Sequence, residues 1–99
     1  MIITTTTSVE GYKIIAYKGL ISAVGVNTRK LSFSFNTEKF IQAMEESIDA
    51  VKQDAFNALE EKAKALNCNA IVGVSVDLET DPSTTFILVS VTGTAVNIV

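Results

Sequence analysis

The sequence contains no histidine, and this absence limits its chemistry more than any other feature. Histidine is a frequent general base in catalysis and the commonest metal ligand. The chain also has one cysteine, Cys68, so it cannot form an intrachain disulfide. A cysteine nucleophile needs a neighbouring base or cation to become a thiolate, and no imidazole is available here. We find no catalytic constellation and therefore predict that the protein is not an enzyme.

Basic residues are scarce as well. The 8 lysine and arginine residues are outnumbered by 11 acidic residues, and Arg29 is the only arginine. Binding to nucleic acid needs a basic stripe that displaces counterions from phosphates, so no nucleic-acid partner is expected. No apolar run approaches the roughly 20 residues that cross a bilayer, which argues against a membrane partner. Residues 1–8 lack the basic and apolar parts of a signal peptide, so we expect a cytoplasmic protein.

Hydrophobic residues, in contrast, are abundant for so short a chain. They make up 47% of the 99 residues, and the mean hydropathy is +0.34. We expect one domain over residues 1–99, and a domain of this size buries only roughly two thirds of its unfolded surface. The apolar surplus therefore predicts a subunit interface, with a second copy of the chain as the partner.

Residues 37–66 carry the clearest pattern of the sequence. Their apolar residues recur at intervals of three and four, which predicts one long amphipathic helix. Glu60 and Lys64 are spaced for an ion pair along that helix, and Asn67 tolerates the left-handed conformation that often ends one. The apolar stripe consists of Phe40, Met44, Ile48, Val51, Ala55, Leu59, Ala63 and Leu66.

The remaining segments favour strands. Residues 12–26 are apolar at both parities, which is typical of a strand covered on both faces. Residues 70–79 alternate, so Ala70 to Leu78 at even positions are expected on one face. The only proline, Pro82, predicts a turn at 80–84. The expected strands are 1–5, 12–26, 70–79, 86–94 and, after a kink at Gly93, 95–99; residues 27–36 suit a short strand or an extended loop.

This order of elements predicts an α+β fold, β-α-β-β, with a small, mostly antiparallel sheet. One helix can cover only one face of such a sheet. The second face needs a cover that the chain does not supply, since it has no second helix. Neighbouring copies of the same chain are the simplest cover.

Four short segments then resemble one known family, and they follow its order along nearly the whole chain. They are Met1-Ile-Ile-Thr-Thr-Thr, Glu10-Gly-Tyr-Lys-Ile, Asn69-Ala-Ile-Val-Gly-Val and Gly93-Thr-Ala-Val. Together they resemble the YbjQ-like family. The resemblance implies a dodecin-like α+β subunit, assembly into homopentameric rings, and the family label "putative heavy-metal-binding". The chain departs from the family pattern at residues 31–37 and at Asn67-Cys68.

Candidate metal ligands are few. Cys68 is the single thiol, and a small buried residue at a helix end is its simpler interpretation. Asp77 and Glu79 share a strand face and Asp81 follows, so these carboxylates are candidates for a hard cation. Their alternative role is a solvated face that keeps the hairpin soluble. Glu45, Glu46 and Asp49 form an acidic patch that we interpret as a solvated helix surface.

Three functions stay open from the sequence. We favour a ring-forming, cytoplasmic protein of unknown biochemical role that binds a small ligand or ion where subunits meet. The alternative is a heavy-metal-binding module. The third is an enzyme that uses carboxylates or a backbone pocket at the interface. No cofactor is predicted, and a divalent metal is the single candidate of that kind.

Overall fold

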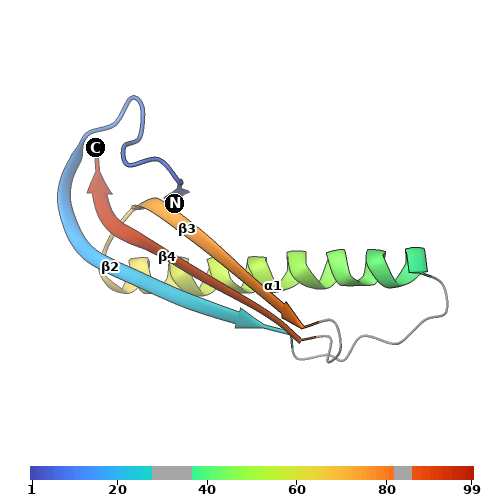
Figure 1. Cartoon of the computed structure of the whole chain (residues 1–99). Helices are drawn as coiled ribbons and strands as arrows, with labels where there is room; N and C mark the ends of the chain where they lie inside the picture. The colour runs from blue at the N-terminus through green and yellow to red at the C-terminus, as the bar shows by residue number, and fades with distance from the viewer. Residues whose placement is uncertain (28–36, 82–85) are drawn as a thin grey trace.

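The computed structural model describes residues 1–27, 37–81 and 86–99, and it confirms the α+β class. Apart from a two-residue first strand, the order is strand, helix, strand, strand (Figure 1). Apart from residue 27, the predicted strand or loop at 27–36 lies outside the described residues, as does most of the predicted turn at 80–84. The elements are β1 (Ile2–Ile3), β2 (Ile14–Val26), α1 (Thr37–Ala65), β3 (Ala70–Asp81) and β4 (Phe86–Ile98).

The strands form one sheet in the order β1-β3-β4-β2. The central β4 pairs antiparallel with β3 and with β2, whereas β1 pairs parallel with β3 at the sheet edge. The predicted separate strand at 95–99 is wrong, because β4 runs without a break from Phe86 to Ile98. Gly93 has a different role from a kink: a Cβ there would lie 2.6 Å from Ile71 Cγ2, so only glycine leaves room for that side chain.

Helix α1 packs on one face of the sheet, over β2 and β4, and scarcely touches β3. We call this side the helix face and the opposite side the back face. The buried residues of α1 recur every four positions, at Val51, Ala55, Leu59 and Ala63. The helix approaches β2 most closely at Gly25, where a Cβ would lie 2.5 Å from the Val51 carbonyl oxygen. Glycine at this position therefore sets the helix-to-sheet distance.

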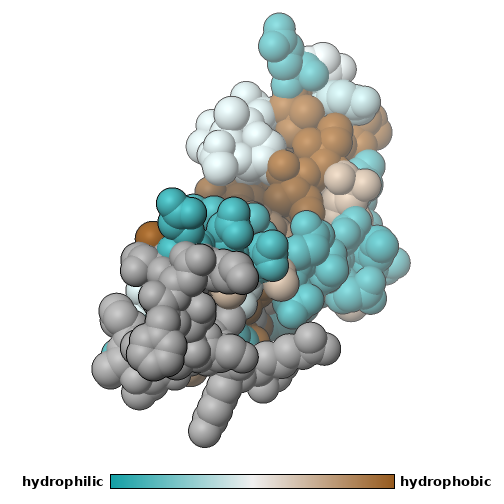
Figure 2. Space-filling model, turned by 90° about the vertical axis from the view of Figure 1, so that its right-hand side faces the viewer, coloured by the Kyte–Doolittle hydropathy of each residue, from teal (hydrophilic) through white to brown (hydrophobic). Residues whose placement is uncertain are grey.

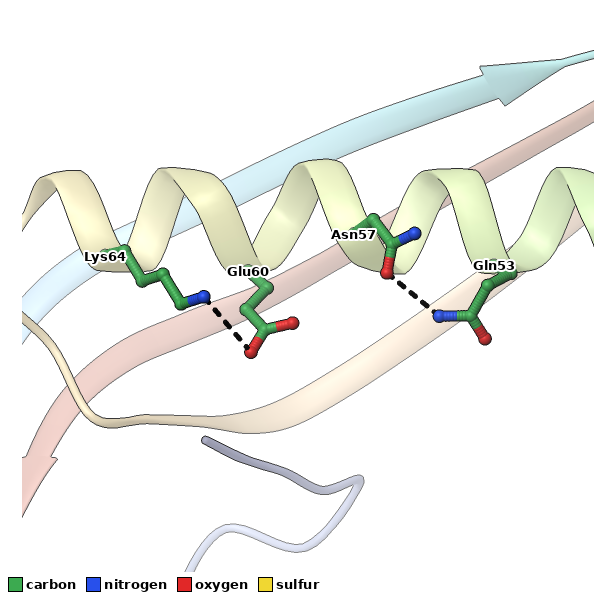
Figure 3. A network of polar contacts seen from close by, with 4 residues as sticks. All are labelled: Gln53, Asn57, Glu60 and Lys64. Atoms are coloured by element: carbon green, nitrogen blue, oxygen red, sulfur yellow. Dashed lines mark hydrogen bonds and ion pairs between the residues drawn. The ribbon is translucent and has the colours of Figure 1, made fainter.

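The helix ends one residue before the predicted limit. Leu66, expected in the apolar stripe, follows the last turn and is 40% exposed. Asn67 adopts the predicted left-handed conformation, with φ of 59°, and its N–H donates to the Lys64 carbonyl. The predicted ion pair is present, with 3.8 Å between Lys64 Nζ and Glu60 Oε1 (Figure 3). A second exposed pair about two turns earlier joins the side chains of Gln53 and Asn57.

A bulge in β3 overturns the predicted single apolar face of that strand. Gly73 has φ of 61°, and the register with β4 shifts between Val72 and Ser75. Before the bulge, Ala70 and Val72 pack on the back face; after it, Val74 packs on the helix face. Because a bulge adds one residue to a strand, the alternation of faces reverses there.

The back face is covered at one end by the chain itself, which the sequence analysis did not foresee. The N-terminal segment folds over it and brings Ile2, Val9 and Ile14 onto a small second cluster. The buried members of that cluster are Ala70, Val72, Val96 and Ile98. The rest of the back face, along the other half of the strands, has no such cover among the described residues.

The molecule is long and narrow. Its radius of gyration is 16.2 Å, compared with about 13 Å for a compact chain of this length. In Figure 1 the first turns of α1 extend beyond the ends of the strands. The accessible surface is 6571 Å², whereas a compact monomer of this mass exposes about 5,500 Å². The protein therefore leaves more surface uncovered than a self-contained domain of its size.

Candidate functional site

Cys68 lies in the connection between α1 and β3 and is buried, as the simpler interpretation predicted. Its N–H donates to the Ala63 carbonyl, and its thiol lies 3.8 Å from the Leu66 carbonyl oxygen. The side chain is part of the core beneath the helix. Because no carboxylate or cation contacts the sulfur in the described chain, Cys68 packs as a small apolar residue.

Two asparagines near Cys68 fix the end of the helix against the sheet, and the sequence analysis did not single them out for this. Asn69 donates through Nδ2 to the Ile98 carbonyl and accepts through Oδ1 from the Ile98 N–H, both at 2.8 Å. Asn97 donates to the Asn67 carbonyl at 3.0 Å, while its own Oδ1 is buried without a partner. These bonds are structural, since they join side chains to backbone within the fold.

The candidate carboxylates lie on β3, on the back face. Asp77 is opposite Ser90, and Glu79 is opposite Leu88. Asp81, which the sequence analysis placed in a turn, is the last residue of β3 and is opposite Phe86. All three carboxylates are exposed, in agreement with a solvated face.

No group of three or more cysteine and carboxylate side chains in the described ranges is close enough to hold a metal ion. Cys68 precedes β3, whereas Asp77 and Glu79 are in the second half of that strand. The acidic residues Glu45, Glu46 and Asp49 are exposed on α1. Within one chain, then, the predicted candidates are not brought together.

What the structure does bring together is an uncovered apolar strip along β2. Leu20 is 85% exposed and Val24 is 58% exposed, and both lie on the back face. Val26 extends the strip, and its cross-strand neighbour Leu88 is half-buried. The back face changes character across the sheet: β2 is apolar, β4 contributes hydroxyl groups at Ser90 and Thr92, and β3 is acidic.

A second uncovered strip lies on the helix face of β3. Val76 and Leu78 are opposite Val91 and Val89, which are fully buried beneath α1. Yet Val76 is 38% exposed and Leu78 is 44% exposed, because the helix lies over β4 and β2 instead. Figure 2, seen from the end where α1 begins, shows hydrophobic side chains gathered in the upper, more distant part of the view, with hydrophilic ones around them. Exposed apolar areas with polar borders are typical of protein interfaces.

One helix packed across a four-stranded mixed sheet defines a class of small α+β subunits. Within that class, the whole chain, residues 1–99, matches the family model described as "Putative heavy-metal-binding". The protein belongs to this YbjQ-like family. The resemblance that the sequence motifs carried is thereby confirmed.

A solved structure shows the same fold. It is a protein of unknown function from Pediococcus pentosaceus, described as a member of the DUF74 family. The two chains are 25% identical, and the TM-score is 0.72. The match covers 100% of this chain and 98% of the other. The similarity therefore extends over the entire fold.

Membrane insertion through the helix finds no support in the structure. Across the described ranges, no helix combines the length and apolar character that crossing a bilayer requires.

Proposed function

We propose that this protein is the subunit of a homo-oligomeric ring, a pentamer by its family resemblance, with a binding or scaffolding role and no catalytic one. The observation that carries the proposal is the pair of uncovered apolar strips, on β2 and on β3. They lie on opposite faces and at opposite sides of the sheet. Two different surfaces of one subunit that meet in a head-to-tail contact generate a closed ring when the rotation closes.

The elongated shape supports the same proposal. The chain exposes about 1,000 Å² more than a compact monomer of its mass. Stable interfaces bury about 800 Å² on each partner, and a subunit of a ring makes two such contacts, so the excess corresponds to more than half of the area of about 1,600 Å² that they require. Small ligands or ions would then bind where subunits meet, since no candidate ligand group is assembled within the described part of one chain.

Light scattering coupled to size-exclusion chromatography tests the ring directly. The tag-free protein at micromolar concentration is expected to give about five times the chain mass of 10.6 kDa. The mass should not change on dilution over a tenfold range. A stable monomer would refute the proposal, and any other closed oligomer would keep the ring while correcting its order.

Heavy-metal binding is the second candidate, favoured by the description of the family. A ring would place several copies of Asp77 and Glu79 around one axis or along each interface. We expect elemental analysis to find metal in whole-number proportion to the ring if this function is correct. Asp77→Ala should then reduce the stoichiometry in a titration with divalent ions, and Cys68→Ala should not, because the thiol is buried. Weak binding that neither variant changes would reject this candidate.

The proposed setting is the cytoplasm, without nucleic acid or a membrane as partner. A single cysteine, kept reduced and buried, suits a reducing compartment. The net charge of −3 opposes binding to phosphate backbones. Fractionation of cells that produce the protein, followed by detection in the soluble fraction, tests the compartment.

A further inference from the structure

We propose that neighbouring copies join by extending the sheet: the outer edge of β2 in one copy pairs, in parallel, with the outer edge of β3 at residues 76–80 of the next. The inference rests on the proposed ring and specifies which surfaces meet in it. It follows from the direction in which the backbone groups of the two edge strands point.

Along its second half, the outer edge of β2 has no neighbouring strand among the described residues, although its Ser22 carbonyl accepts from a helix lysine. Ile87 in β4 directs both of its backbone groups toward the β2 side, to Asn27, and alternate residues of β4 do the same. Their partners in β2 are the odd-numbered residues, so the even-numbered ones point outward. Lys62 Nζ donates to the Ser22 carbonyl, which independently shows that this group points away from β4. The outward-pointing residues are Leu20, Ser22, Val24 and Val26.

The outer edge of β3 is open beyond the bulge. The Val74 N–H donates to the Thr4 carbonyl at 3.1 Å, so Val74 points outward, toward the N-terminal segment. By alternation, Val76, Leu78 and Thr80 point outward as well. β1 pairs only with Ala70 and Ile71, and no described strand follows it along this edge. Within the part of the chain that the structure describes, the sheet therefore has two edges without a neighbouring strand, one on each side.

The helices of two joined copies lie on the same side of the sheet in only one relative strand direction. The pleat of the strands decides which direction that is. Outward-pointing residues of β2 carry their side chains on the back face, and those of β3 carry them on the helix face. Antiparallel pairing would place such residues opposite each other, on one face, and so turn the second copy over. In parallel pairing, each outward-pointing residue bonds to the two residues that flank the one opposite it on the neighbouring strand. The outward-pointing residues of the two strands are therefore staggered, and the back face of one copy continues as the back face of the next.

The rotational symmetry of a ring also makes the two paired strands parallel. β2 and β3 both run antiparallel to β4, so they are parallel to each other within one subunit. Rotation about an axis along the strands preserves strand direction. The next copy therefore presents its β3 parallel to β2, as the pleat requires.

The uncovered strip on β3 gains a cover in this arrangement. Helix α1 packs over β2, the edge strand, and so borders the position where the next β3 would lie. Val76 and Leu78 of that strand, which their own helix leaves exposed, would then lie beside the helix of the neighbouring copy. Each helix would cover strands from two subunits.

Charge also favours pairing of the β2 edge with the β3 edge over pairing of two β3 edges. Lys18 is exposed on β2, and Lys62 reaches the β2 edge from the helix. Asp77 and Glu79 are exposed on β3. Pairing β3 with β3 would bring like carboxylates together, whereas β2 carries no carboxylate, so pairing β2 with β3 avoids that repulsion.

Two proline variants test the arrangement in one mixing experiment. Val24→Pro removes an outward N–H from β2, and Leu78→Pro removes one from β3. Neither N–H serves the ladder with β4, and proline is accepted in edge strands at such positions. Each variant keeps one intact edge. Light scattering should give the ring mass for the unaltered protein and the monomer mass of 10.6 kDa for each variant alone.

An equimolar mixture of the two variants should form a dimer of twice the chain mass, because one intact β2 edge meets one intact β3 edge. A variant that keeps the ring mass by itself, or a mixture that stays monomeric, overturns edge pairing while leaving the ring standing. A dimer of Leu78→Pro alone would show pairing of β2 with β2 and also overturns it. A monomeric unaltered protein refutes the proposed ring as well.

Circular dichroism checks that the variants are folded. Should either proline variant lose its native spectrum, Val24→Lys and Leu78→Lys replace the pair, since a lysine on each edge blocks the same approach without altering the backbone. Glu10→Lys, in an exposed turn away from both edges, changes the charge by two where each edge variant changes it by one, so it is a stringent charge control and should keep the ring mass. The lysine mixture must again give the dimer, or the pairing is rejected.

Discussion

The two halves of the sheet are built from the same strands but differ in what covers them. Where β3 begins and β4 ends, the helix lies on one face and the N-terminal segment on the other, and two clusters of buried side chains result. Where β3 ends and β4 begins, the back face and the helix face of β3 are both uncovered. The helix still buries Ile87 and Val89 of β4 in this second half, so both halves contribute to the core, but only the second also offers surface to a partner. Substitutions in the two halves should differ accordingly.

The largest effect is expected at Leu59, which is fully buried on the side of α1 that packs against the sheet. Leu59→Ala removes buried methyl groups and leaves a cavity, so the free energy of unfolding should fall by about 2–5 kcal/mol. Urea denaturation at one fixed protein concentration measures the change, because assembly makes stability depend on concentration. Leu66→Ala, the same substitution at an exposed position, should cost less than about 1 kcal/mol. Equal effects at the two positions would contradict the helix packing described here.

The next effect concerns the closest approach of the helix to β2. Gly25→Ala places a Cβ against the Val51 carbonyl oxygen, and a backbone group cannot move aside as a side chain can. We expect a loss of about 1–3 kcal/mol, the usual cost of overpacking. Thermal unfolding followed by circular dichroism measures it. Ser22→Ala, at an exposed position of the same strand, should stay within about 0.5 kcal/mol. An unchanged melting temperature for Gly25→Ala would show that the helix can shift.

Local patterns in the sequence predicted the elements well and the tertiary pairing poorly. The helix was expected at 37–66 and extends from Thr37 to Ala65, because periodicity and the left-handed Asn67 are local properties. The faces of β3 were predicted wrongly, since the bulge at Gly73 depends on register with a distant strand. Coverage of the back face by Val9 was also missed, because such contacts join distant parts of the chain.

The same limit applied to the candidate site. Cys68 was correctly expected to be buried, since a small apolar residue after a helix tends to be. The apolar surplus predicted a subunit interface, which stays a prediction, and composition alone cannot assign uncovered apolar surface to particular strands. The edges of β2 and β3 became identifiable only with the strand order, which decides which backbone groups remain without a neighbouring strand.

The smallest effect on the isolated subunit is expected in the uncovered half, at Val76. Val76 and Val91 are directly opposite each other on the helix face, yet Val91 is fully buried and Val76 is not. Threonine has nearly the shape of valine, so Val76→Thr should change the free energy of unfolding of the unassembled chain by less than about 0.5 kcal/mol. Val91→Thr buries a hydroxyl group and should cost about 1–3 kcal/mol.

Assembly should reverse this insensitivity at Val76. If the helix of a neighbouring copy covers this residue, Val76→Thr weakens the contact between subunits, and the ring should dissociate at a higher protein concentration than the unaltered ring. Sedimentation velocity over a dilution series measures the shift. A ring that dissociates at the same concentration with threonine at 76 would show that this strip stays in solvent, and the uncovered half of the sheet would then need another partner.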